Sequence, residues 1–185
     1  VLEAYREVGE LRLEWYDMRY WFRRFGLPGD PGELLERCRE AVRPYPEVPE
    51  VLRRLRAAGW QPVVISNAAR PFMELELRQA GLWDLLEGAV STTSDLGLVK
   101  ADPRAYLEGC RLLGIEPGGL LHVGDHPEFD LRVPASLGIR AYLVDRGGRH
   151  DGHPRALRDL RELLWRLGEE ERAERKGGQG WRGFA

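Results

Sequence analysis

Two acidic residues five positions apart, Asp125 and Asp130, follow an apolar run from Leu120 to Gly124 that is typical of a buried strand. In open α/β sheets ligands bind outside the carboxyl ends of the strands, so an acid directly after such a strand lies in the usual ligand crevice. Two neighbouring carboxylates repel each other, and one proton or one hard cation relieves the repulsion. Mg²⁺ prefers oxygen ligands such as carboxylates, often together with a phosphate group of the substrate. The spacing therefore predicts a magnesium site.

A purely structural role for the same two acids also fits the sequence. Asp125 could cap the next helix, and Asp130 could be a solvated turn residue. Gly-Asp after a strand is common, so this motif taken alone does not decide between the two roles.

Lysine is rare in this chain, since Lys100 and Lys176 are the only lysines among 28 basic residues. A compact ammonium on a flexible stem can contact one oxygen in a crowded site where a planar guanidinium would not fit. Chance placement on a surface loop is the alternative. Lys100 lies just before Asp102-Pro103, a typical helix start, and Ser66-Asn67 lies at the carboxyl end of another apolar strand.

Composition bounds the class of protein. A length of 185 residues with 43% hydrophobic content suits one core with a small appended subdomain. A net charge of −2 gives no overall attraction to nucleic acid or to an anionic membrane, and no apolar run approaches the roughly 18 residues of a membrane helix. Cys38 and Cys110 lack a metal-type spacing, which indicates free, buried thiols and a cytoplasmic location.

Helical and strand patterns alternate along most of the chain, and this alternation predicts a parallel sheet covered by helices. The aromatic residues Trp15, Tyr16, Tyr20 and Trp21 in the first helix could line a pocket, but packing against the next helix is the favoured interpretation. The predicted helices span residues 3–25, 31–42, 47–58, 71–80, 103–113, 128–137 and 154–175, and the predicted strands span residues 61–67, 88–92, 119–123 and 139–144.

The order of these motifs resembles the haloacid dehalogenase-like hydrolase superfamily, in its phosphatase-type branch. Ser66-Asn67 follows one strand, Lys100 precedes a helix, and Gly124-Asp125 with Asp130 follows a later strand. The resemblance covers roughly residues 45–148, and the helices before it are similar to the small C1-type cap of that superfamily. It implies an α/β fold, with a Rossmannoid parallel sheet, helices on both faces and a helical cap.

The resemblance also implies roles for the motif residues. In this superfamily a serine after the second strand binds the transferred phosphoryl group, a lysine neutralises that group and the nucleophile, and late acids hold Mg²⁺. Ser66 and Lys100 are therefore expected to bind phosphate, Lys100 to be catalytic, and Asp125 and Asp130 to bind the metal. Asn67 matches a position that commonly lies beside the substrate.

One part of the superfamily pattern is absent. Its nucleophile is the first Asp of an Asp-x-Asp after an apolar strand, and these 185 residues contain no Asp-x-Asp. In the superfamily that strand is central, between the strands that end here at Ser66 and Gly124. Neighbouring strands are ~4.8 Å apart, so its removal leaves a gap of about 10 Å bordered by unpaired backbone groups. We therefore expect the Asp-x-Asp to lie upstream of residue 1 and the chain by itself to be inactive.

The predicted organisation has a helical cap over residues 1–44, an α/β core over residues 45–170 and a disordered tail over residues 171–185. The predicted function is a Mg²⁺-dependent phosphatase for a small phosphorylated substrate, with neither nucleic acid nor membrane as a partner.

Two alternatives remain open. One is a non-catalytic binding protein or fragment of the same fold. The other, a 2-haloacid dehalogenase, is disfavoured because that branch usually has Ser-Asn where this chain has Gly124-Asp125. A receiver-type signalling domain fits worse, because its lysine follows its last strand, whereas Lys100 comes earlier.

Overall fold

The structure is a computed structural model, and it describes residues 1–177. Its helices and strands run, in chain order, α1 (Leu2–Val8), η1 (Leu13–Tyr16), α2 (Met18–Phe25), α3 (Pro31–Cys38), η2 (Arg39–Ala41), α4 (Val48–Ala57), β1 (Val63–Ser66), α5 (Arg70–Gln79), η3 (Trp83–Leu85), β2 (Gly88–Ser91), α6 (Thr92–Asp95), α7 (Arg104–Leu113), η4 (Pro117–Gly119), β3 (Leu121–Gly124), η5 (Pro127–Arg132), α8 (Val133–Ser136), β4 (Arg140–Val144), β5 (Ala156–Leu157) and α9 (Leu160–Gly177).

The strands form two parallel sheets. β1 pairs with β2 from Val63 opposite Gly88 to Ser66 opposite Ser91, and β3, β4 and β5 pair side by side. No backbone pairing joins β1 to β3 within the described part of the chain. The predicted α/β fold is confirmed, and the break between the sheets lies where a central strand is expected to be missing.

Two apolar clusters hold the two sheets together. In the first, Ile65 of β1 packs with Tyr106 of α7 and Val133 of α8. In the second, α4 and α9 share a cluster with β3 and its neighbours; its members are Leu55, Trp60, Leu121, Val123, Tyr142, Leu157, Leu163 and Leu167. Because α4 precedes β1 in the chain yet packs with β3, the helices bridge the break in the sheet.

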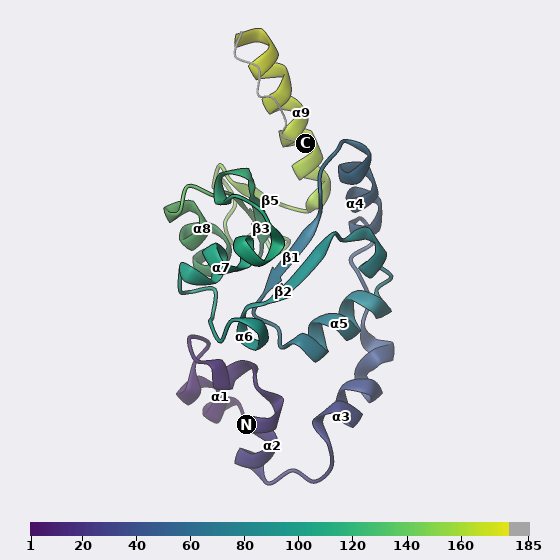
Figure 1. Cartoon of the computed structure of the whole chain (residues 1–185), viewed down its shortest axis with the longest axis vertical. Helices are drawn as coiled ribbons and strands as arrows, with labels where there is room; N and C mark the ends of the chain where they lie inside the picture. The colour runs from purple at the N-terminus through teal and green to yellow at the C-terminus, as the bar shows by residue number, and fades with distance from the viewer. Residues whose placement is uncertain (178–185) are drawn as a thin grey trace.

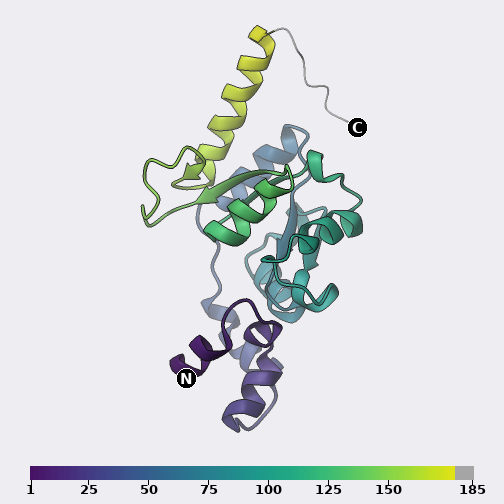
Figure 2. The same cartoon turned by 90° about the vertical axis from the view of Figure 1, so that its left-hand side faces the viewer.

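Residues 1–44, which the sequence predicts to be a cap, form a group of helices at one end of the molecule, and α9 projects from the opposite end (Figures 1 and 2). Arg146, just after β4, holds the linker between cap and core. Its guanidinium lies 3.6 Å from the centre of the Tyr45 ring and 2.7 Å from the Glu47 carboxylate. No described helix combines the length and apolar character that a membrane span requires.

The expectation of one continuous helix over residues 3–25 is wrong. Gly9 has a φ of 76°, which ends α1, and the Asp17 side chain accepts the Arg19 N–H at 2.8 Å, which starts α2. Glycine adopts positive φ without steric cost, and an N-terminal Asp satisfies a free helix donor. These two local effects outweigh the apolar stripe.

The aromatic residues of the cap mainly pack against one another. Tyr5 stacks on Trp21 with ring centres 3.8 Å apart and meets Trp15 edge-on at 5.0 Å. The Trp21 indole N–H donates to the Trp15 carbonyl oxygen at 3.0 Å. Trp21 is buried as a result. These rings pack, as the favoured interpretation expects, but the aromatic contacts are with one another and not with the helix predicted over residues 31–42.

Two predicted helices differ in the structure. The helix predicted over residues 128–137 begins as the π-helix η5 and becomes the α-helix α8 at Val133. The helix predicted from residue 154 starts only at Leu160. Ala156 and Leu157 instead form the short strand β5, which pairs with the edge of β4 that β3 does not occupy.

Helix α9 continues to Gly177, two residues beyond the helix end predicted at residue 175 and past residue 171, where the predicted tail begins. Residues 178–185 of that predicted tail lie outside the described residues. Both cysteines are free, as predicted, but only Cys110 is buried. Cys38 is exposed because it ends α3, which buries only Leu35.

Candidate active site

Lys100 connects the ends of the two sheets. It lies in the loop before α7, and its side chain is 11% exposed. Its backbone N–H donates to Asn67 Oδ1, just after β1, at 2.8 Å. Its ammonium donates to Asp130 Oδ1, in the helix after β3, at 2.5 Å. The structure thus brings three sequence-predicted residues to the same edge of the fold, where β1 and β3 end.

Asp130 is buried and its two oxygens accept hydrogen bonds from protein donors. Oδ1 accepts from Lys100 and, at 2.9 Å, from His122 Nε2, and Oδ2 accepts from the His126 backbone N–H at 2.9 Å. Burial alone would raise the pKa of this carboxyl. The hydrogen bond from His122 and the charge of Lys100 outweigh burial and hold the pKa of Asp130 well below its usual range.

Gly124 is required at the end of β3 because the Asp130 side chain lies against it. A Cβ at Gly124 would lie 2.2 Å from Asp130 Cγ, a distance that no side chain tolerates. The Gly of the Gly-Asp motif therefore makes room for the carboxylate that binds Lys100.

Asp125 differs from Asp130, although the sequence pattern treats them as a pair. Asp125 is exposed, and its carboxylate has no hydrogen-bond or ion-pair partner among residues 1–177. Over the same residues no group of three acidic, histidine or cysteine side chains could hold a metal ion by itself. Mg²⁺ commonly binds one or two carboxylates together with substrate phosphate and water, and an exposed, unpaired Asp125 fits that arrangement.

Ser66 and Asn67 share the end of β1 but differ in their surroundings. Ser66 is half-buried; its Oγ accepts the Ala68 N–H at 3.1 Å, and its own proton has no acceptor in the described chain. Asn67 is buried, and both the oxygen and the nitrogen of its amide make hydrogen bonds. Besides Lys100, Oδ1 accepts from Thr92 Oγ1 at 2.8 Å, and Nδ2 donates to the Tyr16 hydroxyl at 3.0 Å. Ser66 is thus free to donate to a ligand, whereas the Asn67 side chain is occupied.

The cap contacts this site through two hydrogen bonds that sequence reasoning missed. Tyr16 accepts from Asn67 and donates to the Glu10 carbonyl oxygen at 3.0 Å, and burial raises the pKa of its hydroxyl. His126 Nε2 lies 3.3 Å from Glu10 Oε1. The segment from Glu10 to Tyr16 thereby contacts the chain just after both β1 and β3. In the sequence Tyr16 is one of several neighbouring aromatic residues, and its spacing does not distinguish it from the others.

Replacing Tyr16 with Phe tests this contact between cap and core. The substitution leaves Asn67 Nδ2 without an acceptor and the Glu10 carbonyl without a donor, so we expect a loss of about 1–2 kcal/mol in the free energy of unfolding, measured with urea. Tyr20→Phe is the matched control in the same cap, because its hydroxyl bonds only to Arg24 at the surface. Equal effects of the two substitutions would contradict the assignment.

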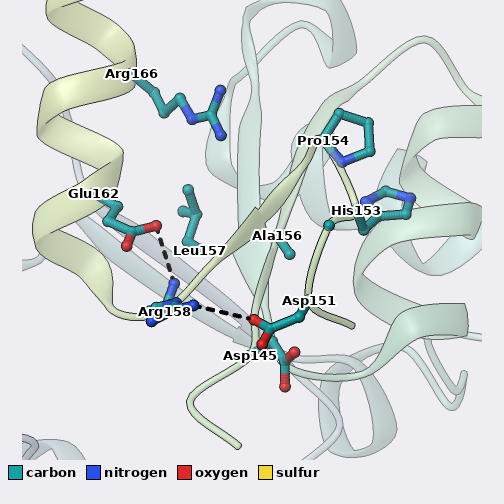
Figure 3. A pocket seen from close by; sticks show the side chains of 10 residues that line it. Asp145, Asp151, His153, Pro154, Ala156, Leu157, Arg158, Glu162 and Arg166 are labelled. Atoms are coloured by element: carbon teal, nitrogen blue, oxygen red, sulfur yellow. Dashed lines mark hydrogen bonds and ion pairs between the residues drawn. The ribbon is translucent and has the colours of Figure 1, made fainter. Parts of the chain in front are cut away.

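A separate cavity of about 270 Å³ lies beside β5 and the start of α9 (Figure 3). Its acidic side chains already have partners. Asp145 accepts the Arg149 and His150 N–H groups at 3.0 and 2.5 Å, and Glu162 accepts the Arg158 N–H at 3.1 Å. None of the predicted site residues lines this cavity, so it is distinct from the site around Lys100.

Comparison with known proteins finds a matching family and several similar proteins. The family profile described as haloacid dehalogenase-like hydrolase matches residues 10–138. The phosphoserine phosphatase of Thermus thermophilus is 32% identical over 139 residues, which cover 74% of this chain and 55% of that protein. The (S)-2-haloacid dehalogenase 4A of Burkholderia cepacia is 29% identical over 104 residues, which cover 56% of this chain and 44% of that protein.

Among solved structures, a HAD phosphatase from Thermococcus onnurineus superposes with a TM-score of 0.81 at 27% identity, covering 90% of this chain and 77% of that one. The chain spans about half the length of the curated relatives it matches.

Proposed function

Because this chain belongs to the haloacid dehalogenase-like hydrolase family, we propose that it forms the phosphate-binding and metal-binding part of a phosphatase. The proposed substrate is a small phosphomonoester. Neither nucleic acid nor a membrane is a proposed partner, and the two free cysteines support a cytoplasmic location.

The observation that carries the proposal is the bridge made by Lys100. Through Asn67 and Asp130 it draws together the ends of β1 and β3. Ser66 is the last residue of β1, next to Asn67, and Asp125 directly follows β3. A transferred phosphoryl group needs charge stabilisation by a cation, an ammonium and hydroxyl or amide donors more than it needs bonds from the protein. These side chains supply those elements.

Each side chain has a proposed role. Ser66 donates its hydroxyl proton to a phosphoryl oxygen, and Lys100 offsets the charge of the phosphate. Asp130, predicted as a second metal ligand, is instead proposed to orient Lys100, because both of its oxygens accept hydrogen bonds from the protein. Asp125 is the residue proposed to hold Mg²⁺. The Asn67 amide oxygen holds the Lys100 loop, so a contact from Asn67 to substrate would use its backbone or the second N–H of its amide. When bound, Mg²⁺ would offset negative charge on the phosphate oxygens.

The nucleophile is proposed to come from a strand outside these 185 residues. β1 and β3 each pair with another strand on one side only, and helices bridge the break between them. An apolar strand inserted there would end beside Lys100. An Asp at its end would lie where the ammonium can offset the charges of both nucleophile and phosphate.

Relatives with dehalogenase and with phosphatase names both match this chain, so the site chemistry decides between the two reactions. A carboxylate at position 125 repels the carboxylate of a 2-haloacid substrate unless a cation lies between them. In a phosphatase that uses Mg²⁺, the metal ion lies between such a carboxylate and the substrate phosphate. The unpaired Asp125 therefore favours the phosphatase.

The test is a panel of phosphomonoesters and 2-haloacids, with and without Mg²⁺, on a form of the protein that carries the missing strand. We expect Mg²⁺-dependent phosphate release and a decrease of about tenfold or more on Asp125→Asn, since the amide loses the charge that holds the cation. Halide release would favour the dehalogenase. Ligand binding without turnover would favour a non-catalytic protein, and unchanged turnover in the variant would refute the role of Asp125.

A further inference from the structure

Two buried side chains lie behind the pair formed by Lys100 and Asp130. Tyr106 of α7 has no exposed surface, and His122 of β3 is 8% exposed. His122 Nε2 lies 2.9 Å from Asp130 Oδ1 and 3.0 Å from the Tyr106 hydroxyl. The two rings meet edge-on with centres 5.0 Å apart. Neither residue has a role in the proposed mechanism so far.

The geometry of the hydrogen bonds assigns the protons in this cluster. The one hydroxyl proton of Tyr106 goes to the Phe129 carbonyl oxygen at 2.6 Å, which is much closer than Asp130 Oδ1 at 3.4 Å, so toward His122 the hydroxyl accepts. His122 Nε2 must therefore carry a proton, which it directs at Asp130 Oδ1 and the tyrosine oxygen together. Burial lowers the pKa of His122, and it is the contacts with Asp130 and Tyr106 that place a proton on Nε2.

From this geometry we propose that Tyr106 and His122 are positioning residues that hold the Asp130 carboxylate in the orientation that binds Lys100. The role rests on the proposed function, because it matters for catalysis only if Lys100 binds phosphate. Because the imidazole ring is rigid, its N–H holds Asp130 Oδ1 in one position. The His126 backbone N–H holds Oδ2, at 2.9 Å. Tyr106 selects the imidazole tautomer that can donate.

A packing role for His122 predicts different behaviour. If the ring only fills space, an apolar side chain of similar size replaces it and a polar one does not. If the ring acts as a donor, glutamine replaces it, because the Gln amide nitrogen can take the place of Nε2. His122→Leu and His122→Gln therefore separate the two roles. His122→Asn is a second contrast, because its shorter amide does not reach Asp130.

The readout is the reactivity of Lys100, which is measurable because the chain has only one other lysine, Lys176. Reductive methylation with ¹³C-formaldehyde at one fixed pH, followed by NMR, gives the labelling rate of Lys100 relative to Lys176 in the same sample. The 185-residue chain is used without substrate or metal. The result is thus independent of turnover, and loss of the proposed phosphatase activity would not affect it.

We expect His122→Leu and His122→Asn to raise the relative labelling rate of Lys100 about fivefold, the equivalent of one lost hydrogen bond, and His122→Gln to stay within about twofold of the parent chain. Tyr106→Phe is expected to give an intermediate increase. If the leucine variant does not fold, the Asn and Gln pair makes the same comparison. Equal rates in those two variants, or an unchanged rate in all of them, would overturn the proposal.

Discussion

The 185-residue chain by itself is expected to release no phosphate above the uncatalysed rate, and a peptide strand ending in Asp-x-Asp is expected to raise the rate at least about a thousandfold. The chain holds the proposed phosphate-binding and metal-binding side chains but no nucleophile on a strand between β1 and β3. The facing edges of those strands present backbone N–H and C=O groups that a parallel strand can pair with. Binding of the strand would position its Asp beside Lys100.

The peptide can be designed from the fold. β1 and β3 are four residues long, and a parallel strand buried on both faces reads as a continuous apolar run. A suitable peptide has about five Val, Ile or Leu residues before Asp-x-Asp, which matches both the strand length and the apolar pattern. Lysines at its amino end keep it soluble. A peptide ending in Asn-x-Asn is the matched control. Backbone NMR shifts confined to the strands and their neighbours would establish that both peptides bind.

Phosphate release from a generic aryl phosphate with Mg²⁺ is the measurement. Turnover by the chain alone would contradict the proposed source of the nucleophile. Equal turnover with the two peptides would show that the aspartates of the strand are not used. Binding of both peptides without any turnover would favour the non-catalytic alternative.

Asp130→Asn is expected to lower the free energy of unfolding by about 3–5 kcal/mol, because it leaves the buried ammonium of Lys100 without a charged partner. The amide also has only one oxygen to accept from His122, His126 and Lys100 in place of two. Urea unfolding at pH 7 is the measurement. Asp125→Asn is the matched control five residues away, and its exposed side chain predicts a change within about 0.5 kcal/mol.

The effect of Asp130→Asn is expected to depend on pH. Because the pKa of Asp130 is lower in the folded chain than in the unfolded chain, the unfolded state takes up its proton first as the pH falls. The stabilisation is fully present above the unfolded pKa of about 4 and is lost as the pH falls below it toward the folded pKa. The difference between parent and variant should therefore narrow below about pH 4. A constant difference from pH 7 to pH 3 would refute a charge-based role.

Most of the fold could be predicted because its signals are local. The helices α4, α5 and α7 and the four main strands match the predicted segments to within a few residues, since apolar periodicity and glycine ends act over short stretches. The errors arose where a local signal competed with a longer pattern. Gly9 and Asp17 divide a helix whose apolar stripe continues through them, and Leu157 joins a strand because the edge of β4 is available.

The sequence by itself determined the family resemblance, the parallel α/β architecture, the absence of Asp-x-Asp and the residues Ser66, Lys100, Asp125 and Asp130 as candidates. Only the tertiary structure decided which of those residues contact one another and which are buried. Asp130 and Asn67 are buried and occupied by Lys100, whereas Asp125 is exposed and unpaired. The decisive contacts join residues 30, 33 and 51 positions apart, and spacing along a chain carries no information about which distant groups meet.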